Sequence, residues 1–396
     1  MTVKNTVISW NNTALDVLRA TGVRPPEASR AMATIHVAMH DATGWAERTH
    51  RVRRDRSLKS RCVWEKTACA IAAHVVLTRL FPEQSRFLDV ALGASLPGGL
   101  PSDLGVTLGQ SSAEAVLQWR ENDHSDDVVP YVPLDRPGTW RPTPPDYEDA
   151  HAPHWPMVTP FATSSSSQFH SAGHPGITSP EYASALDKTK RLGGKNSRAR
   201  TDDQTQIAHF WADGAGTVIL WNLVAQQVLL SEDRSLSDAA RLLALLNAAL
   251  ADAVTSAWHD KFHFNLWRPV TAIREAHLDG NPLTEADPTW EPLCATTPEP
   301  EHTSAHCAVS GAASQILRLF LGRDIVPFSL TSVKPPEISR SFRSFSEAAR
   351  EAADSRIYAG LHFEFSTSSG LAKGRYIADH VWRYLRPLRE KESLKC

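Results

Sequence analysis

Residues Thr297 to Gly322 read TPEPEHTSAHCAVSGAASQILRLFLG. Polar residues and prolines extend to Ser304, and apolar residues then recur at helical spacing up to Gly322, a common residue at a helix C-terminus. The first turn of such a helix presents unpaired backbone N–H groups and the positive end of the helix dipole, which together bind anions. His306 lies in that turn, where its imidazole can exchange a proton with a bound oxyanion. The stretch therefore predicts a helix that begins at an oxyanion site.

A preceding segment, WHDKFHFNLWRPV from Trp258 to Val270, contains two cations in mostly aromatic or apolar surroundings. Lys261 and Arg268 are seven residues apart in the sequence, which is about two helical turns, so we expect both to project from one helix face. Buried cations require an anionic partner. The segment therefore predicts two of the positive groups of the oxyanion site.

A third segment, DSRIYAGLHFEFS from Asp354 to Ser366, supplies another cation and another histidine. Arg356 and His362 flank an apolar run that includes Gly360, where the backbone can bend or pack closely. Three cations, a serine hydroxyl, a helix start and two histidines are the groups that would hold a tetrahedral or trigonal oxyanion.

These segments resemble a known signature. Lys-x6-Arg-Pro at 261–269, Ser-x-His at 304–306 and Ser-Arg-x5-His at 355–362 resemble, in order and spacing, the three motifs of the vanadium-dependent haloperoxidases. The acid and lipid phosphatases of the type 2 phosphatidic acid phosphatase superfamily share this signature. The resemblance extends through residues 210–214 and 140–145 to the helical start near 10–41. It is closest to soluble bacterial haloperoxidase-like proteins.

The resemblance implies roles for these positions. With vanadate as cofactor, His362 would be the protein ligand to vanadium, and His306 would be the acid/base that deprotonates hydrogen peroxide. The vanadate oxygens would be bound by Lys261, Arg268, Arg356, the Ser304 hydroxyl and the Ala305 N–H. A halide would then be oxidised to the hypohalite level and passed to a small organic acceptor. With phosphate, a near-isostere, His362 would instead be the nucleophile of a phosphatase or diphosphate-processing enzyme, with His306 protonating the leaving oxygen.

Several positions depart from the family pattern. Ala305 stands where many members have glycine, but it keeps its N–H donor. Ser366 stands where the phosphatase pattern has an aspartate that orients the histidine, which argues against the phosphatase alternative. Glu299 replaces an aromatic or uncharged residue near the halide, and its charge would repel that anion. Trp258 matches the chloroperoxidase-like members. From the loss of Phe or His near the halide, we expect bromide to be oxidised more readily than chloride.

Composition sets broader limits. The chain has 396 residues, a net charge of -2 and a pI near 6.8, which give no reason to expect nucleic-acid binding. The N-terminus lacks a signal-peptide core, and no run approaches the roughly eighteen apolar residues of a membrane helix, so we expect a soluble cytoplasmic protein without membrane contact. Five scattered cysteines suit a reducing compartment. Homodimers are common among bacterial members of the family.

Periodicity predicts a mainly α-helical bundle with almost no strand signal. We expect two regions, an N-terminal helical region over 1–200 and a C-terminal bundle over 201–396 that carries the site. Within the first region, residues 121–194 are rich in proline and serine and predict a long irregular excursion that covers the site. The His36 and His40 pair has helical spacing, but its Ala-rich and Met-rich face favours core packing over a metal site.

Overall fold

The computed structural model describes residues 5–52, 58–96, 102–212, 214–332 and 337–385. It is mainly helical, as predicted, and forms a helical bundle. The main helices are α1 (Thr6–Thr21), α2 (Pro25–Val52), α3 (Leu58–Leu80), α4 (Ser85–Ser95), α5 (Asp103–Trp119), α6 (Pro180–Gly193), α7 (Asp202–Phe210), α8 (Gly214–Ser231), α9 (Leu236–Phe264), α10 (Pro269–Arg274), α11 (Ala305–Leu321), α12 (Phe345–Tyr358) and α13 (Glu364–Leu385).

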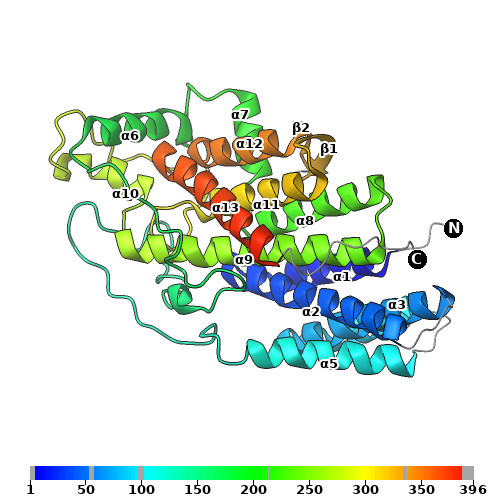
Figure 1. Ribbon diagram of the computed structural model, residues 1–396. Coiled ribbons are helices and arrows are strands. Elements are labelled where there is room, and N and C mark those ends of the chain that lie inside the picture. Colours follow the sequence, from blue (N-terminus) through cyan, green and yellow to red (C-terminus); the bar gives the residue numbers. More distant parts are fainter. Residues whose placement is uncertain (1–4, 53–57, 97–101, 213, 333–336, 386–396) are drawn as a thin grey trace.

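The long helix α9 runs through the middle of the bundle (Figure 1). On one side it packs against α2, which in turn contacts α3 and α5; on the other side it packs against α11 and α13. One apolar cluster extends across both sides, from Val7 in α1 to Val381 in α13. The N-terminal helices therefore share a core with the helices that carry the predicted site, and the proposed division near residue 200 remains a prediction.

Helix α9 corrects the expectation about long apolar runs. Its N-cap is Ser235, whose side chain accepts a hydrogen bond from the Asp238 N–H. Among the described residues, α9 is the one unbroken helix that is long and apolar enough to span a membrane. The expectation that the chain has no such run is therefore wrong. However, 94% of that apolar window is buried inside the structure. Its composition is that of a core helix surrounded by other helices.

The expected placement of Lys261 and Arg268 on one helix is wrong. Helix α9 ends at Phe264 because Asn265 adopts a left-handed conformation with φ of 52°, and its N–H bonds to the Lys261 carbonyl. Arg268 lies beyond this stop as the N-cap residue of α10. The helix therefore ends between the two cations, and they come from consecutive elements.

The last part of the predicted excursion, 180–193, is helix α6, whereas the chain between α5 and α6 is irregular apart from the short 3-10 turn Trp155–Met157. Its aromatic residues Trp140, Trp155 and Phe161 are buried, so they anchor the segment to the body of the protein. Buried Asp252 of α9 adds polar anchors, because its carboxylate accepts the N–H groups of the successive residues Phe161, Ala162 and Thr163.

Some elements were not predicted. A hairpin of β1 (Ile325–Thr331) and β2 (Ser339–Ser344) lies between α11 and α12, and the short helix α4 follows α3. The Pro335-Pro336 link falls outside the described residues. Cys62 is disulfide-bonded, whereas Cys69, Cys294 and Cys307 are free.

Candidate oxyanion site

The predicted helix start is confirmed. Helix α11 begins at Ala305, and the Ser304 side chain caps it by accepting the Cys307 N–H at 3.4 Å. Helix α13 passes so close to this turn that a Cβ at Gly370 would lie 2.5 Å from the Ser304 carbonyl oxygen. A glycine is therefore required at this crossing.

Lys261 and Arg268 are fully buried and already have partners. The Lys261 ammonium donates to the carbonyl oxygen of Pro300 at 2.6 Å, and burial lowers its pKa. The Arg268 guanidinium donates to the Glu299 carbonyl oxygen at 2.7 Å and to the Glu299 carboxylate at 2.7 Å. It also contacts His362 Nε2 at 3.2 Å. The structure thus brings both cations to the segment 299–301 that precedes α11.

Arg356, on α12, is the third predicted cation at this site. It is buried, and one of its terminal nitrogens donates to the Trp211 carbonyl oxygen at 3.1 Å. Its Nε is a buried donor without a hydrogen-bond partner. A buried guanidinium N–H without an acceptor is costly, so this atom indicates a missing anionic partner.

His362 has a carboxylate partner that sequence reasoning missed. Its Nδ1 lies 2.9 Å from Oε1 of Glu301, a fully buried residue, and the same oxygen accepts the Phe363 N–H at 2.9 Å. The Ser366 hydroxyl donates to the other Glu301 oxygen at 2.5 Å. The argument from a missing aspartate at position 366 is therefore wrong, because Glu301, which is hydrogen-bonded to Ser366, supplies a carboxylate to the histidine. The adjacent motif Pro300-Glu301-His302 gave no signal of this pairing.

A hydrogen-bond chain continues away from Glu301. His302 Nδ1 lies 2.8 Å from the Ser366 hydroxyl, and His302 Nε2 lies 3.1 Å from the Ser171 hydroxyl. Because Ser366 donates to Glu301, His302 must donate to Ser366 and accept from Ser171. The chain thus connects the irregular excursion to His362 and fixes which side chains carry the protons.

His306 points toward α8. Its Nδ1 lies 2.8 Å from the Thr217 hydroxyl, and its ring packs edge-on against Trp211 with ring centroids 6.1 Å apart. Burial, and secondarily the charge of Arg356, hold the pKa of His306 well below its usual value. Burial and then Arg268 lower the pKa of His362 in the same way. Both histidines are therefore neutral at pH 7, and Thr217 is a second residue that the sequence did not reveal.

Glu299 lies between the cations and an open pocket. Its carboxylate is 2.7 Å from Arg268 and 3.8 Å from Lys261. Although burial opposes ionisation, Arg268 and then Lys261 hold its pKa below the usual value. Glu299 is therefore an ionised partner of the cations, so its charge is largely balanced and the expected repulsion of a halide is reduced.

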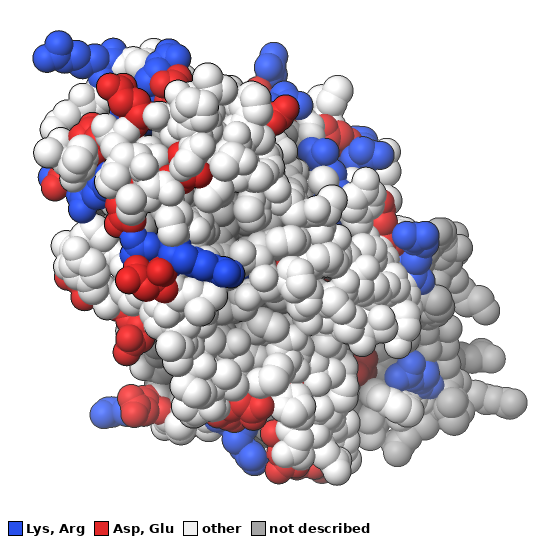
Figure 2. Space-filling view, turned by 90° about the vertical axis from the view of Figure 1, so that its left-hand side faces the viewer, with Lys and Arg blue, Asp and Glu red and all other residues white. Residues whose placement is uncertain are grey.

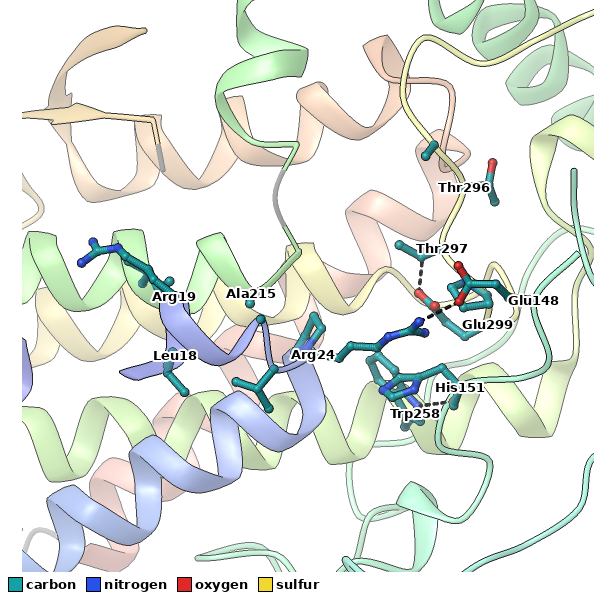
Figure 3. A pocket seen from close by; sticks show the side chains of 16 residues that line it. Leu18, Arg19, Arg24, Glu148, His151, Ala215, Trp258, Thr296, Thr297 and Glu299 are labelled. Atoms are coloured by element: carbon teal, nitrogen blue, oxygen red, sulfur yellow. Dashed lines mark hydrogen bonds and ion pairs between the residues drawn. The ribbon is translucent and has the colours of Figure 1, made fainter. Parts of the chain in front are cut away.

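The pocket has a volume of about 500 Å³ and reaches the site at Glu299. Figure 3 shows Trp258 and His151 beside Glu299, with Arg24 extending toward Glu148 across the pocket. Trp258 donates to the His151 carbonyl oxygen at 3.3 Å, and Arg24 pairs with Glu148 at 2.7 Å. Of the predicted residues near the halide, Trp258 and Glu299 therefore line one cavity.

The end of the bundle that carries α6 and α10 shows no continuous patch of one charge. On the face drawn in Figure 2, coloured Lys, Arg, Asp and Glu residues are interspersed among a broad uncharged area.

The residues present fit an oxyanion such as vanadate. Arg356 has an unpartnered buried Nε, and the N–H groups of the first turn of α11 have no intrahelical acceptor. His362 donates through Nδ1 to Glu301, so Nε2 carries the lone pair that a vanadium ligand requires. The predicted residues of the site thus lie together in the structure, and Glu301 and Thr217 join them.

Comparisons with known proteins bear on the family and the fold. Residues 241–391 match the family model of the VCPO second helical-bundle domain. Vanadium chloroperoxidase of Curvularia inaequalis is 23% identical over 490 aligned residues, covering 92% of this chain and 79% of that protein. A bacterial vanadium-dependent iodoperoxidase shares the fold with a TM-score of 0.79 and 24% identity, over 96% of this chain and 95% of that one. A holo bacterial vanadium-dependent chloroperoxidase has a TM-score of 0.75 and 17% identity, over 92% and 93%.

Proposed function

This chain belongs to the vanadium haloperoxidase family, and we propose that it is a vanadate-dependent haloperoxidase that uses hydrogen peroxide to oxidise a halide. The reaction would consume peroxide, halide and one proton and would release a hypohalous acid and water. The observation that carries this proposal is the unpartnered buried Arg356 Nε together with the first turn of α11 and with His362, whose Nε2 now accepts from Arg268 at 3.2 Å and could instead hold an oxyanion cofactor.

Each residue has a role that follows from its contacts. Lys261, Arg268 and Arg356 would balance the charge of vanadate, and the Ser304 hydroxyl and Ala305 N–H would orient its oxygens. His362 would hold the cofactor through Nε2. When bound, vanadate supplies a Lewis acid that activates peroxide without a change in oxidation state. His306, neutral because it is buried, would accept the proton of the incoming peroxide, with Thr217 fixing its ring.

Two variants test the roles of the histidines. We expect His362→Ala to abolish vanadate binding, because the ligand atom is removed. We expect His306→Ala to bind vanadate but to lose turnover, because only the proton acceptor is missing. Binding can be measured by equilibrium dialysis and turnover by monochlorodimedone bromination. Vanadate binding that survives in His362→Ala would contradict the ligand assignment.

We propose further that bromide is oxidised more readily than chloride. The support is Glu299, a carboxylate in the position where halogenating relatives carry an aromatic or uncharged residue, together with the easier oxidation of bromide. The pairing of Glu299 with Arg268 at 2.7 Å balances part of its charge, which reduces its repulsion of an anion. Chloride turnover equal to or above bromide turnover in the same assay would contradict this preference.

A phosphatase remains the second candidate, and one contact favours it. The 2.9 Å contact between Glu301 and His362 Nδ1 supplies the carboxylate that a nucleophilic histidine requires. In that reaction His362 Nε2 would attack phosphorus and His306 would protonate the departing oxygen.

A further inference from the structure

Three histidines, His170, His259 and His263, gather around the buried carboxylate of Asp260, which precedes Lys261 in the sequence. His259 and Asp260 lie in the last turns of α9, and His170 comes from the irregular excursion. His170 Nδ1 is 3.1 Å from Asp260 Oδ1, and His259 Nδ1 is 3.5 Å from the same oxygen. The third histidine, His263, packs its ring 4.7 Å from that of His170 and 5.7 Å from that of His259.

The two oxygens of Asp260 face different partners. Oδ2 pairs with the ammonium of Lys373 on α13 at 2.8 Å, and both of these side chains are buried. Oδ1 faces the histidines and the Ser171 N–H, which is 3.4 Å away. Lys373 is therefore the partner of Oδ2, while Oδ1 remains directed toward the imidazoles of His170 and His259.

We propose that His170, His259 and Asp260 bind a divalent transition-metal ion of the Zn²⁺ class. One ligand atom from each lies within 4.8 Å of the others. Ligands about 2.0–2.2 Å from a zinc ion can be no more than about 4.4 Å apart, so a small movement completes the site. The His170 side chain, 37% exposed, can make that movement. Water or His263 would fill the fourth position.

The ligand types select the class of ion. Two imidazoles and one carboxylate suit Zn²⁺, Co²⁺ or Ni²⁺, whereas Mg²⁺ and Ca²⁺ prefer shells of oxygen atoms. The ion would cross-link the excursion to α9 next to Ser171, whose hydroxyl contacts His302 at 3.1 Å. This role is structural, and it does not depend on the reaction proposed above.

The test uses the full chain after treatment with a chelator, without vanadate, at pH 7.5. Isothermal titration with ZnCl₂ is expected to show one saturable site, and MgCl₂ is expected to show none. His170→Gln and His259→Gln should each weaken Zn²⁺ binding at least about tenfold. His277→Gln, an exposed histidine outside the cluster, is the matched control and should bind like the unaltered protein. Unchanged circular dichroism would show that each variant is folded.

Two further measurements locate the ion. Co²⁺ should give visible absorption bands of nitrogen and oxygen ligation in the unaltered protein but not in His259→Gln. His362→Ala should keep its Zn²⁺ affinity, because its site is separate. The proposal is overturned if Zn²⁺ shows no saturable binding, if binding survives in both His170→Gln and His259→Gln, or if it disappears in His362→Ala.

Discussion

Glu301 and His362 form a buried pair in which a carboxylate oxygen lies 2.9 Å from the ring Nδ1. The two residues are 61 positions apart, and each belongs to a segment that the sequence motifs had already singled out. The pairing sets the tautomer of His362 and directs Nε2 toward Arg268. A carboxylate partner also raises the basicity of a ligating imidazole, so the strength of oxyanion binding should depend on Glu301.

Glu301→Gln tests this dependence. Glutamine keeps the shape of the side chain but removes the charge, so we expect the protein to fold and its vanadate affinity to fall about 10-fold to 100-fold. Equilibrium dialysis of vanadate measures the change without reliance on turnover. Glu285→Gln, at a side chain that is 91% exposed, is the control. An unchanged dissociation constant in Glu301→Gln would refute the positioning role.

A carboxylate at position 366 should partly replace Glu301. The Ser366 hydroxyl lies 2.5 Å from Glu301 Oε2, so an aspartate there would reach the space that Glu301→Ala vacates. We expect the double variant Glu301→Ala, Ser366→Asp to bind vanadate more tightly than Glu301→Ala alone. The four proteins of this double-mutant cycle give the coupling energy directly. If the effects of the two substitutions on the free energy of vanadate binding are strictly additive, a carboxylate at 366 does not take the place of Glu301.

Glu299→Gln should make the stability of the protein depend more strongly on a bound anion. The change leaves buried Arg268 and Lys261 with less negative charge nearby, so we expect a loss of about 1–3 kcal/mol of stability. Phosphate or vanadate would replace the missing charge, so either anion should raise the melting temperature more in this variant than in the unaltered protein. Thermal unfolding of Glu299→Gln and of the unaltered protein, each with and without added anion, measures both effects. Equal anion-induced shifts would contradict the role of Glu299 as a counter-ion.

Thr217→Val should separate binding from turnover. Valine matches the shape of threonine but cannot bond to His306, whose Nδ1 is 2.8 Å from the hydroxyl. We expect turnover to fall about tenfold or more through loss of a positioned acid/base, while vanadate affinity remains unchanged. A parallel loss of vanadate affinity would mean that Thr217 supports the whole site.

Stability should depend on pH through His36, which is buried and hydrogen-bonded to Asn11 at 2.8 Å. Burial lowers its pKa from 6.5 to about 3, so the unfolded chain binds a proton that the folded protein excludes over this range. The stabilisation by neutral His36 is therefore present above pH 6.5 and is lost as the pH falls toward 3. Between pH 7.5 and 5.5, the free energy of unfolding should decrease by about 1.4 kcal/mol more in the unaltered protein than in His36→Gln. Equal decreases would contradict a neutral buried His36.

The sequence predicted the elements whose signals are local. Ser304, the apolar periodicity and Gly322 define α11 correctly because caps and amphipathic spacing act within a few residues. The spacing of Lys261 and Arg268 was misread because the left-handed Asn265 ends α9 between them. Glu301 and Thr217 were missed because their partners lie far along the chain, and only tertiary packing brings them to the two histidines.

The most direct test of the proposed function compares two activities of the purified protein. One assay measures bromide oxidation with orthovanadate and hydrogen peroxide, and the other measures phosphate release from p-nitrophenyl phosphate without vanadate. We predict oxidation that requires vanadate, with little phosphate release. Phosphate release that vanadate inhibits, without halide oxidation, would contradict the haloperoxidase proposal and would identify His362 as a nucleophile supported by Glu301.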